Sequence, residues 1–150
     1  AVMRYLARRF DYYGDTESDQ IWIDILQDEA YDFRNLIIST AYTLGTEYQI
    51  AFNEFTSTAV PRYLDGFENY LSNRGIHTHF VGSRISLVDF ILYELIWQVS
   101  IMVPGSVTNI HRVSLWAFIE VFEKIPQIAT YMASSDYIDR PINSPWASFT

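Results

Sequence analysis

The longest run of apolar positions lies just past the middle of the chain, from Leu87 to Val103, and its start has the pattern of a helix N-terminus. Ser86 and Asp89 have the spacing of a capping box, in which each side chain binds the backbone N–H of the other residue. Ile85 and Phe90 flank this pair at the spacing of a hydrophobic staple. Apolar residues then occupy nearly the whole circumference, so the sequence predicts a core helix surrounded by others.

Two long helical patterns precede this core helix. Thr16 and Asp19 form a second capping-box pair and open a stretch that Gly45 is expected to end. The next stretch, 47–73, is expected to be kinked or divided at Pro61, which has no N–H to donate, and to end at Gly75. In the first stretch the helical period is held by Trp22, Leu26, Phe33, Ile37, Thr40 and Leu44. In the second the expected inward face is Phe52, Phe55, Tyr63, Leu64, Phe67 and Leu71.

The remaining patterns are shorter. Residues 1–9 are typical of a helix without a cap, and residues 76–84 are expected to form a loop. After the core helix, one apolar-periodic piece is followed by a helix with Pro126 in its first turn and, from Ser134, by an irregular surface tail. Since strand patterns and repeats are lacking, the chain is predicted to be one all-α domain of five or six helices. The expected periodic positions of the piece after the core helix are Val113, Trp116, Ala117, Glu120 and Val121.

Composition excludes several classes of function. With 150 residues, 49% of them hydrophobic, the chain can bury a core as a single domain. Its net charge of −8 disfavours nucleic acids and anionic membrane surfaces as partners. The chain has no Cys, which removes thiol catalysis, disulfides and thiolate metal sites. The apolar run is short for a membrane span and carries polar residues, so a cytoplasmic protein is expected.

No complete enzyme motif is present. The sequence lacks a glycine-rich phosphate loop, a nucleophile elbow and a His-Glu-x-x-His helix. His77, His79 and His111 could bind a metal only if folding brought a third ligand close. We interpret them as ordinary loop histidines and expect no metal site.

Charged residues form two rows with a period of four. Asp24, Asp28 and Asp32 share one helical face, and Arg4 and Arg8 form a complementary cationic row. The acidic row alone cannot surround a metal ion, and a solvated face is its common interpretation. The sharper alternative is that the two rows meet, either within the fold or across a twofold interface.

Polar and aromatic residues gather on another side of the same predicted helix. Tyr31, Asn35 and Tyr42 are separated by four and seven residues, with Arg34 beside them. Hydroxyl-bearing rings and a guanidinium suit a pocket for apolar molecules that carry a polar or electrophilic group. The competing interpretation is that these tyrosines pack against neighbouring helices.

Many short segments along nearly the whole chain match, in order, one known pattern. They are Met3-Arg4-Tyr5-Leu6-Ala7-Arg8, Gly14-Asp15-Thr16-Glu17, Asp24-Ile25-Leu26, Tyr31-Asp32, Ala41-Tyr42, Phe80-Val81-Gly82, Ile85-Ser86-Leu87-Val88-Asp89-Phe90, Ile125-Pro126-Gln127-Ile128, Tyr131-Met132, Ser134-Ser135, Pro141, Ser144, Trp146 and Phe149. In these segments the chain resembles the helical C-terminal domain of cytosolic glutathione transferases, most closely the mu class. The resemblance implies an all-α bundle of that type.

The resemblance also implies roles for particular residues. Asp32 matches an acid that reaches across the dimer to the glutathione of the other subunit, and Tyr42 matches a tyrosine that assists the reaction. Ser86 and Asp89 match a capping box that serves folding. Other positions match the electrophile site, namely Tyr31, Arg34, Asn35, Tyr42 and Ser144, or the dimer interface, namely Arg4, Arg8 and Asp24.

One departure from the family decides the expected function. The thioredoxin-like domain that supplies most glutathione contacts is absent, except that residues 1–9 resemble its last helix, which leaves 10–150 as the helical domain. The loop from Gly75 to His79 and the segment 108–112 also differ. The resemblance therefore implies the electrophile-binding half of a homodimeric transferase that uses glutathione as co-substrate, needs no other cofactor and is inactive by itself. The alternatives are a truncated non-catalytic binding module and a helical scaffold without a ligand.

Overall fold

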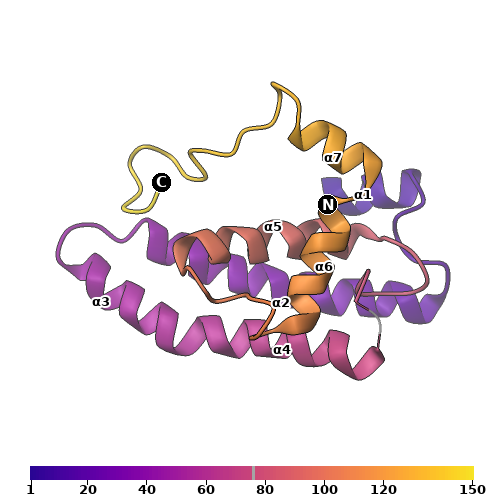
Figure 1. The fold of residues 1–150 in the computed structure, drawn as a ribbon, viewed down its shortest axis with the longest axis horizontal. Coiled ribbons are helices and arrows are strands. Elements are labelled where there is room, and N and C mark those ends of the chain that lie inside the picture. The colour runs from indigo at the N-terminus through magenta and orange to yellow at the C-terminus, as the bar shows by residue number, and fades with distance from the viewer. Residues whose placement is uncertain (76) are drawn as a thin grey trace.

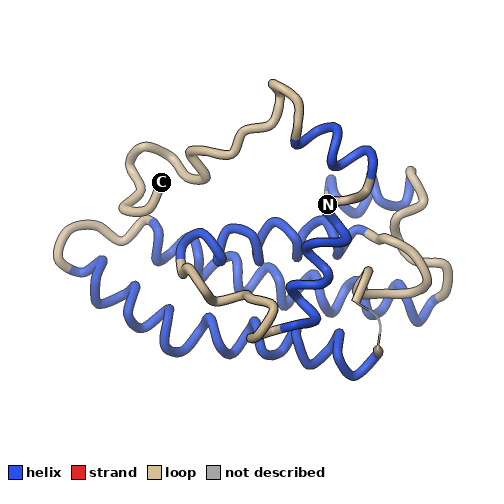
Figure 2. The backbone as a smooth tube through the Cα atoms, in the orientation of Figure 1, coloured by secondary structure: helices blue, strands red, loops and turns tan. Residues whose placement is uncertain are grey.

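Helix α5 (Leu87–Met102) lies against the long helix α2 (Glu17–Ala41), and this pair is the centre of the fold (Figure 1). The computed structural model describes residues 1–75 and 77–150, which contain helices and loops but no strand (Figure 2). The other elements are α1 (Val2–Arg9), α3 (Glu47–Glu54), the π-helix η1 (Phe55–Ala59), α4 (Val60–Arg74), α6 (Val113–Glu123) and α7 (Pro126–Met132). Because α3, η1 and α4 continue as one rod, the described residues form six helical rods, which confirms the predicted all-α fold.

The start of α5 is the predicted capping box. Oδ2 of Asp89 accepts the backbone N–H of Ser86 at 2.7 Å and the Ser86 hydroxyl at 3.0 Å. The second predicted box is also present, since Thr16 and Asp19 bind each other's backbone N–H at the start of α2. Both helices therefore begin where local chemistry predicts.

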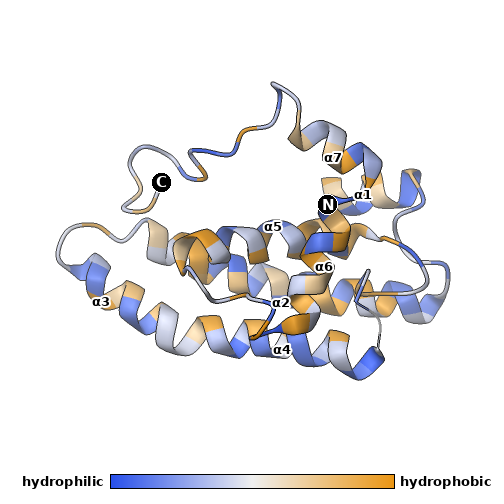
Figure 3. Ribbon diagram, in the orientation of Figure 1, coloured by the Kyte–Doolittle hydropathy of each residue, from blue (hydrophilic) through white to orange (hydrophobic). Residues whose placement is uncertain are grey.

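The rod that packs beside α2 passes through a proline without breaking. Pro61 lies in the first turn of α4, directly after the π-helix η1, in which the N–H of Val60 binds the carbonyl of Phe55. The sequence predicted a kink or division at Pro61; the structure has the wider π-turn of η1 directly before this proline, within a rod that continues. Gly75 ends the rod with a φ of 64°, the left-handed conformation expected of a C-terminal glycine. Hydrophobic and hydrophilic bands alternate along α3 and α4 (Figure 3).

The core lies between this rod, α2, α5 and α6. In the rod the predicted inward positions are buried, except that Phe52 is only half-buried. In α2 two of the expected periodic positions lie outside the buried face, because Trp22 is 40% exposed and Leu44 lies beyond the helix. The buried face of α2 repeats about every three or four residues and includes Ile23, Leu26, Ala30, Phe33, Ile37, Thr40 and Ala41.

The periodic positions expected for helix α6 do not form its buried face. Val113, Trp116 and Val121 are exposed. The buried residues are instead Ser114, Leu115, Phe118 and Phe122. This helix is apolar on most sides, so its period alone does not select the face that packs.

Helix α2 ends earlier than predicted. It stops at Ala41 with Tyr42 as the C-cap, and Gly45 lies in the following loop. The irregular C-terminal tail explains this end, because Ser148 donates its N–H to the carbonyl of Ala41 at 2.8 Å and its hydroxyl to that of Thr43. A further helical turn would need those carbonyls for its own bonds.

The two ends of the chain are the helix α1 and, after α7, an irregular tail. The predicted helix over 1–9 is present as α1, while its assignment to a separate domain stays a prediction. Helix α7 begins at Pro126, and the predicted irregular tail arches away from it and returns to the end of α2 (Figure 1). The predicted loop 76–84 is described from residue 77, since Ile76 lies outside the described residues. Within the described part, no helix has the length and apolarity that crossing a bilayer requires.

Candidate functional site

Two neighbouring cavities lie along α2 and α5. One of about 470 Å³ is bordered by the C-terminal halves of these helices and by the tail, and includes Tyr42 and Ser144. The other, of about 540 Å³, is bordered at its far end by α1 and includes Tyr31. Arg34 and Glu94 line both cavities. The helices and the tail therefore form one extended candidate site with an anion and a cation at its middle.

Tyr42 is held by the tail. Its hydroxyl oxygen accepts the backbone N–H of Ser144 at 3.2 Å. Because Ser148 also anchors the tail to the end of α2, the two segments are fixed beside each other although they are about a hundred residues apart. Tyr42 is 42% exposed, so its phenol proton can reach a bound molecule.

The predicted site residues are only partly brought together. Arg34, Tyr42 and Ser144 line one cavity, and Tyr31 lines the adjoining one with Arg34. Neither cavity includes Asn35 or Asp32, which are exposed on α2. These two assignments stay predictions.

Sequence reasoning missed two polar residues of the site. Glu94 and Gln98 lie four residues apart on α5, and the Gln98 amide donates to the Glu94 carboxylate at 3.2 Å. Both line the cavity beside Tyr42. A signal for them existed, because they are polar positions at helical spacing within an otherwise apolar run.

The acidic and basic rows meet within the fold through Arg4, which contacts Asp24 and Asp28. The Nε atom of Arg4 lies 3.0 Å from Oδ1 of Asp24, and its NH2 group lies 3.2 Å from Oδ1 of Asp28. Arg8 lies over the ring of Tyr13, whose hydroxyl donates to Asp24. Burial and the bond to Asp24 raise the pKa of Tyr13. Of the two alternatives, contact within the fold is therefore present, and a role of Arg4, Arg8 and Asp24 in a dimer stays a prediction.

The histidines were interpreted as loop residues. The ring of His79 hydrogen-bonds the side chain of Thr78 and the carbonyl of Gly82. Among the described residues, no three side chains of the His, Asp and Glu types gather as a metal site would require.

Comparison with known proteins places this chain in a family. The fold is that of a solved helical domain: a pi-class glutathione S-transferase of Onchocerca volvulus superposes with a TM-score of 0.83 over 97% of this chain and 68% of that chain, at 22% identity. The family model "Glutathione S-transferase, C-terminal domain" matches residues 31–135. The chain therefore belongs to the glutathione S-transferase family, as its C-terminal helical domain.

Curated relatives agree with this membership. The chain is 32% identical to "Glutathione S-transferase Mu 1" of Rattus norvegicus over 150 residues, and 29% identical to "Glutathione S-transferase Mu 3" of Homo sapiens over 153 residues. These matches cover 100% and 99% of this chain, but only 65% and 63% of the relatives. The chain thus spans less than two thirds of the length of these proteins.

Proposed function

We propose that the protein acts in the conjugation of glutathione to hydrophobic electrophiles, and that this chain supplies the electrophile-binding half of the active site. The observation that carries the proposal is the cavity in which Arg34, Tyr42 and Ser144 gather from α2 and the tail. Membership of the transferase family supplies the reaction class. The mu-like class is supported by the relatives' names.

The chemistry assigned to Tyr42 follows from its position. When a thiolate adds to an electrophilic carbon, negative charge develops on the electrophile or its leaving group. A phenol that donates its proton toward that charge stabilises the transition state. The Ser144 N–H fixes the Tyr42 oxygen as an acceptor, so the phenol proton is directed away from the tail. Arg34 adds a positive charge in the same cavity.

Other parts of the reaction are assigned outside this cavity. A thioredoxin-like domain would hold glutathione and lower the pKa of its thiol by hydrogen bonding to the thiolate. Asp32 is exposed on α2, and in a homodimer we assign it to the glutathione of the other subunit. We place the complete protein in the cytoplasm.

Turnover by the isolated 150 residues tests whether the electrophile-binding half is inactive without a glutathione-binding domain. We expect the purified chain to conjugate glutathione to 1-chloro-2,4-dinitrobenzene no faster than buffer does. The same assay on the chain joined to a mu-class thioredoxin-like domain should show turnover. Activity of the isolated chain would overturn the assignment, whereas ligand binding without turnover in the joined protein would favour a non-catalytic binding module.

A further inference from the structure

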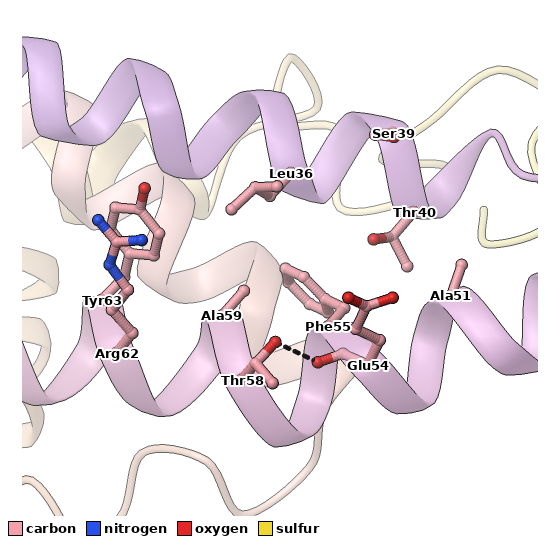
Figure 4. A pocket seen from close by; sticks show the side chains of 10 residues that line it. All are labelled: Leu36, Ser39, Thr40, Ala51, Glu54, Phe55, Thr58, Ala59, Arg62 and Tyr63. Atoms are coloured by element: carbon pink, nitrogen blue, oxygen red, sulfur yellow. Dashed lines mark hydrogen bonds between the residues drawn. The ribbon is translucent and has the colours of Figure 1, made fainter.

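A third cavity lies between α2 and the rod of α3, η1 and α4 (Figure 4). It encloses about 310 Å³, near the lower limit of ligand cavities, which suits a compound with a single ring. It includes neither Tyr42 nor Arg34, so it is separate from the proposed electrophile site.

The π-helix shapes one wall of this cavity. Phe55 and Ala59, which begin and end η1, both line the cavity and are buried. Three successive hydroxyls of η1 compensate for the wider turn by donating to backbone carbonyls four residues earlier, among them Thr58 to the carbonyl of Glu54 at 2.6 Å (Figure 4). Such π-turns within helices are frequent at functional sites.

The middle of the cavity is apolar and its two ends are oppositely charged. Figure 4 shows Leu36 of α2 and Phe55 facing each other across the middle. Arg62 stands at one end, with its guanidinium carbon 5.1 Å from the ring centroid of Tyr63. Glu54 stands at the other end near Thr40, a polar residue that is only 6% exposed.

Both terminal charges, Glu54 and Arg62, are on exposed residues of the rod. The ion pairs formed among the described residues use neither Glu54 nor Arg62. Eight residues separate them along the rod, which places their backbones about 12 Å apart. A cation at one end and an anion at the other fix the orientation of a ligand, because each attracts only its complement.

We propose that this cavity binds a small aromatic carboxylic acid with a hydroxyl group at the opposite end of the molecule. The carboxylate binds Arg62, the ring packs between Leu36 and Phe55, and the hydroxyl donates to Glu54 beside Thr40. A para-substituted phenylpropionate has the required rod-like shape. Guanidinium–carboxylate hydrogen bonds supply most of the specificity.

The test uses 3-(4-hydroxyphenyl)propionate and the 15N-labelled protein. We expect saturable NMR shifts of backbone amides in 36–40 and 51–63. Arg62→Gln should weaken binding about tenfold, since it removes a charge-assisted bond. Arg9→Gln makes the same charge change on exposed α1 and should leave the dissociation constant unchanged.

The hydroxyl end is tested with a second ligand and a second variant. Glu54→Ala should weaken binding of the hydroxylated acid several-fold but not that of 3-phenylpropionate, which lacks the hydroxyl. Ala51→Phe fills the cavity from its wall and should abolish binding of both. The proposal is overturned by shifts that do not saturate, by shifts centred on Tyr42, or by equal effects of Arg62→Gln and Arg9→Gln. None of these outcomes bears on the conjugation assay.

Discussion

The carboxylate of Asp89 accepts the backbone N–H of Phe80 at 2.6 Å while it also caps α5 through Ser86. One fully buried acid thus ties the loop before the helix to the helix start. Phe80 is itself buried, 5.0 Å from Phe118 between ring centroids, so the bond also positions an aromatic contact between this loop and α6. The capping box of α5 is therefore a tertiary connection as well as a local one.

Removing this carboxylate should destabilise the protein strongly. Asp89→Ala leaves the buried N–H groups of Ser86 and Phe80 without an acceptor, at an expected cost of about 3 kcal/mol in the free energy of unfolding. Urea denaturation measures this loss in the free energy of unfolding. Asp19→Ala removes the matching acid of the less buried box at α2 and should cost only about 1 kcal/mol. Equal losses in the two variants would contradict the tertiary role of Asp89.

The same acid makes stability depend on pH. Burial raises the pKa of Asp89 from 3.8 to about 6, although its hydrogen bonds with Ser86 and Phe80 partly oppose the rise. A raised pKa means that the folded state binds the proton more tightly than the unfolded state does. The part of the stability that depends on this proton is therefore fully present below about pH 4 and is lost as pH rises through about 6, while the hydrogen bonds of the carboxylate to Ser86 and Phe80 remain.

The measurement compares the protein with Asp89→Asn, which cannot titrate at this position. The free energy of unfolding of the wild type, relative to that of Asp89→Asn, should rise by up to about 3 kcal/mol as pH falls from 7 to 4. A difference that is flat over this range would show that the pKa of Asp89 is not raised.

Both capping boxes were predictable because each lies within four residues of sequence. The face of α6 was not, because a helix that is apolar on most sides packs on whichever face its neighbours require. The end of α2 and the setting of Tyr42 depend on Ser148 and Ser144, which are about a hundred residues away. The local sequence pattern therefore predicted the helices and the candidate residues. Which of these residues share a cavity depends on contacts between distant parts of the chain.

Another long-range contact predicts a stability effect at α6. Glu68 of α4 accepts the N–H groups of Ser114 at 3.0 Å and Leu115 at 2.9 Å, and so caps α6 from a different helix. Glu68→Ala should lower the free energy of unfolding by about 1–2 kcal/mol, and Glu68→Gln, which keeps one acceptor, by less. Thermal denaturation measures both. Asn69→Ala, at an exposed neighbouring position, is the control and should change little.

The last prediction concerns Tyr42 in a transferase that contains this chain together with a glutathione-binding domain. Tyr42→Phe removes the phenol donor and the acceptor for Ser144, so kcat/KM for an electrophile that develops oxyanion character should fall about tenfold. Because Tyr42 is 42% exposed, the free energy of unfolding should change by less than about 0.5 kcal/mol.

The control for this variant is Tyr131→Phe, the same change at an exposed tyrosine of α7 that lines neither cavity along α2 and α5. It should leave kcat/KM unaltered. A second comparison uses a chloronitrobenzene, whose transition state places its charge on a nitro-substituted ring; the effect of Tyr42→Phe should be smaller there because less charge develops within reach of the phenol. Equal losses for both electrophiles would mean that Tyr42 acts by shaping the cavity and not by donating its proton.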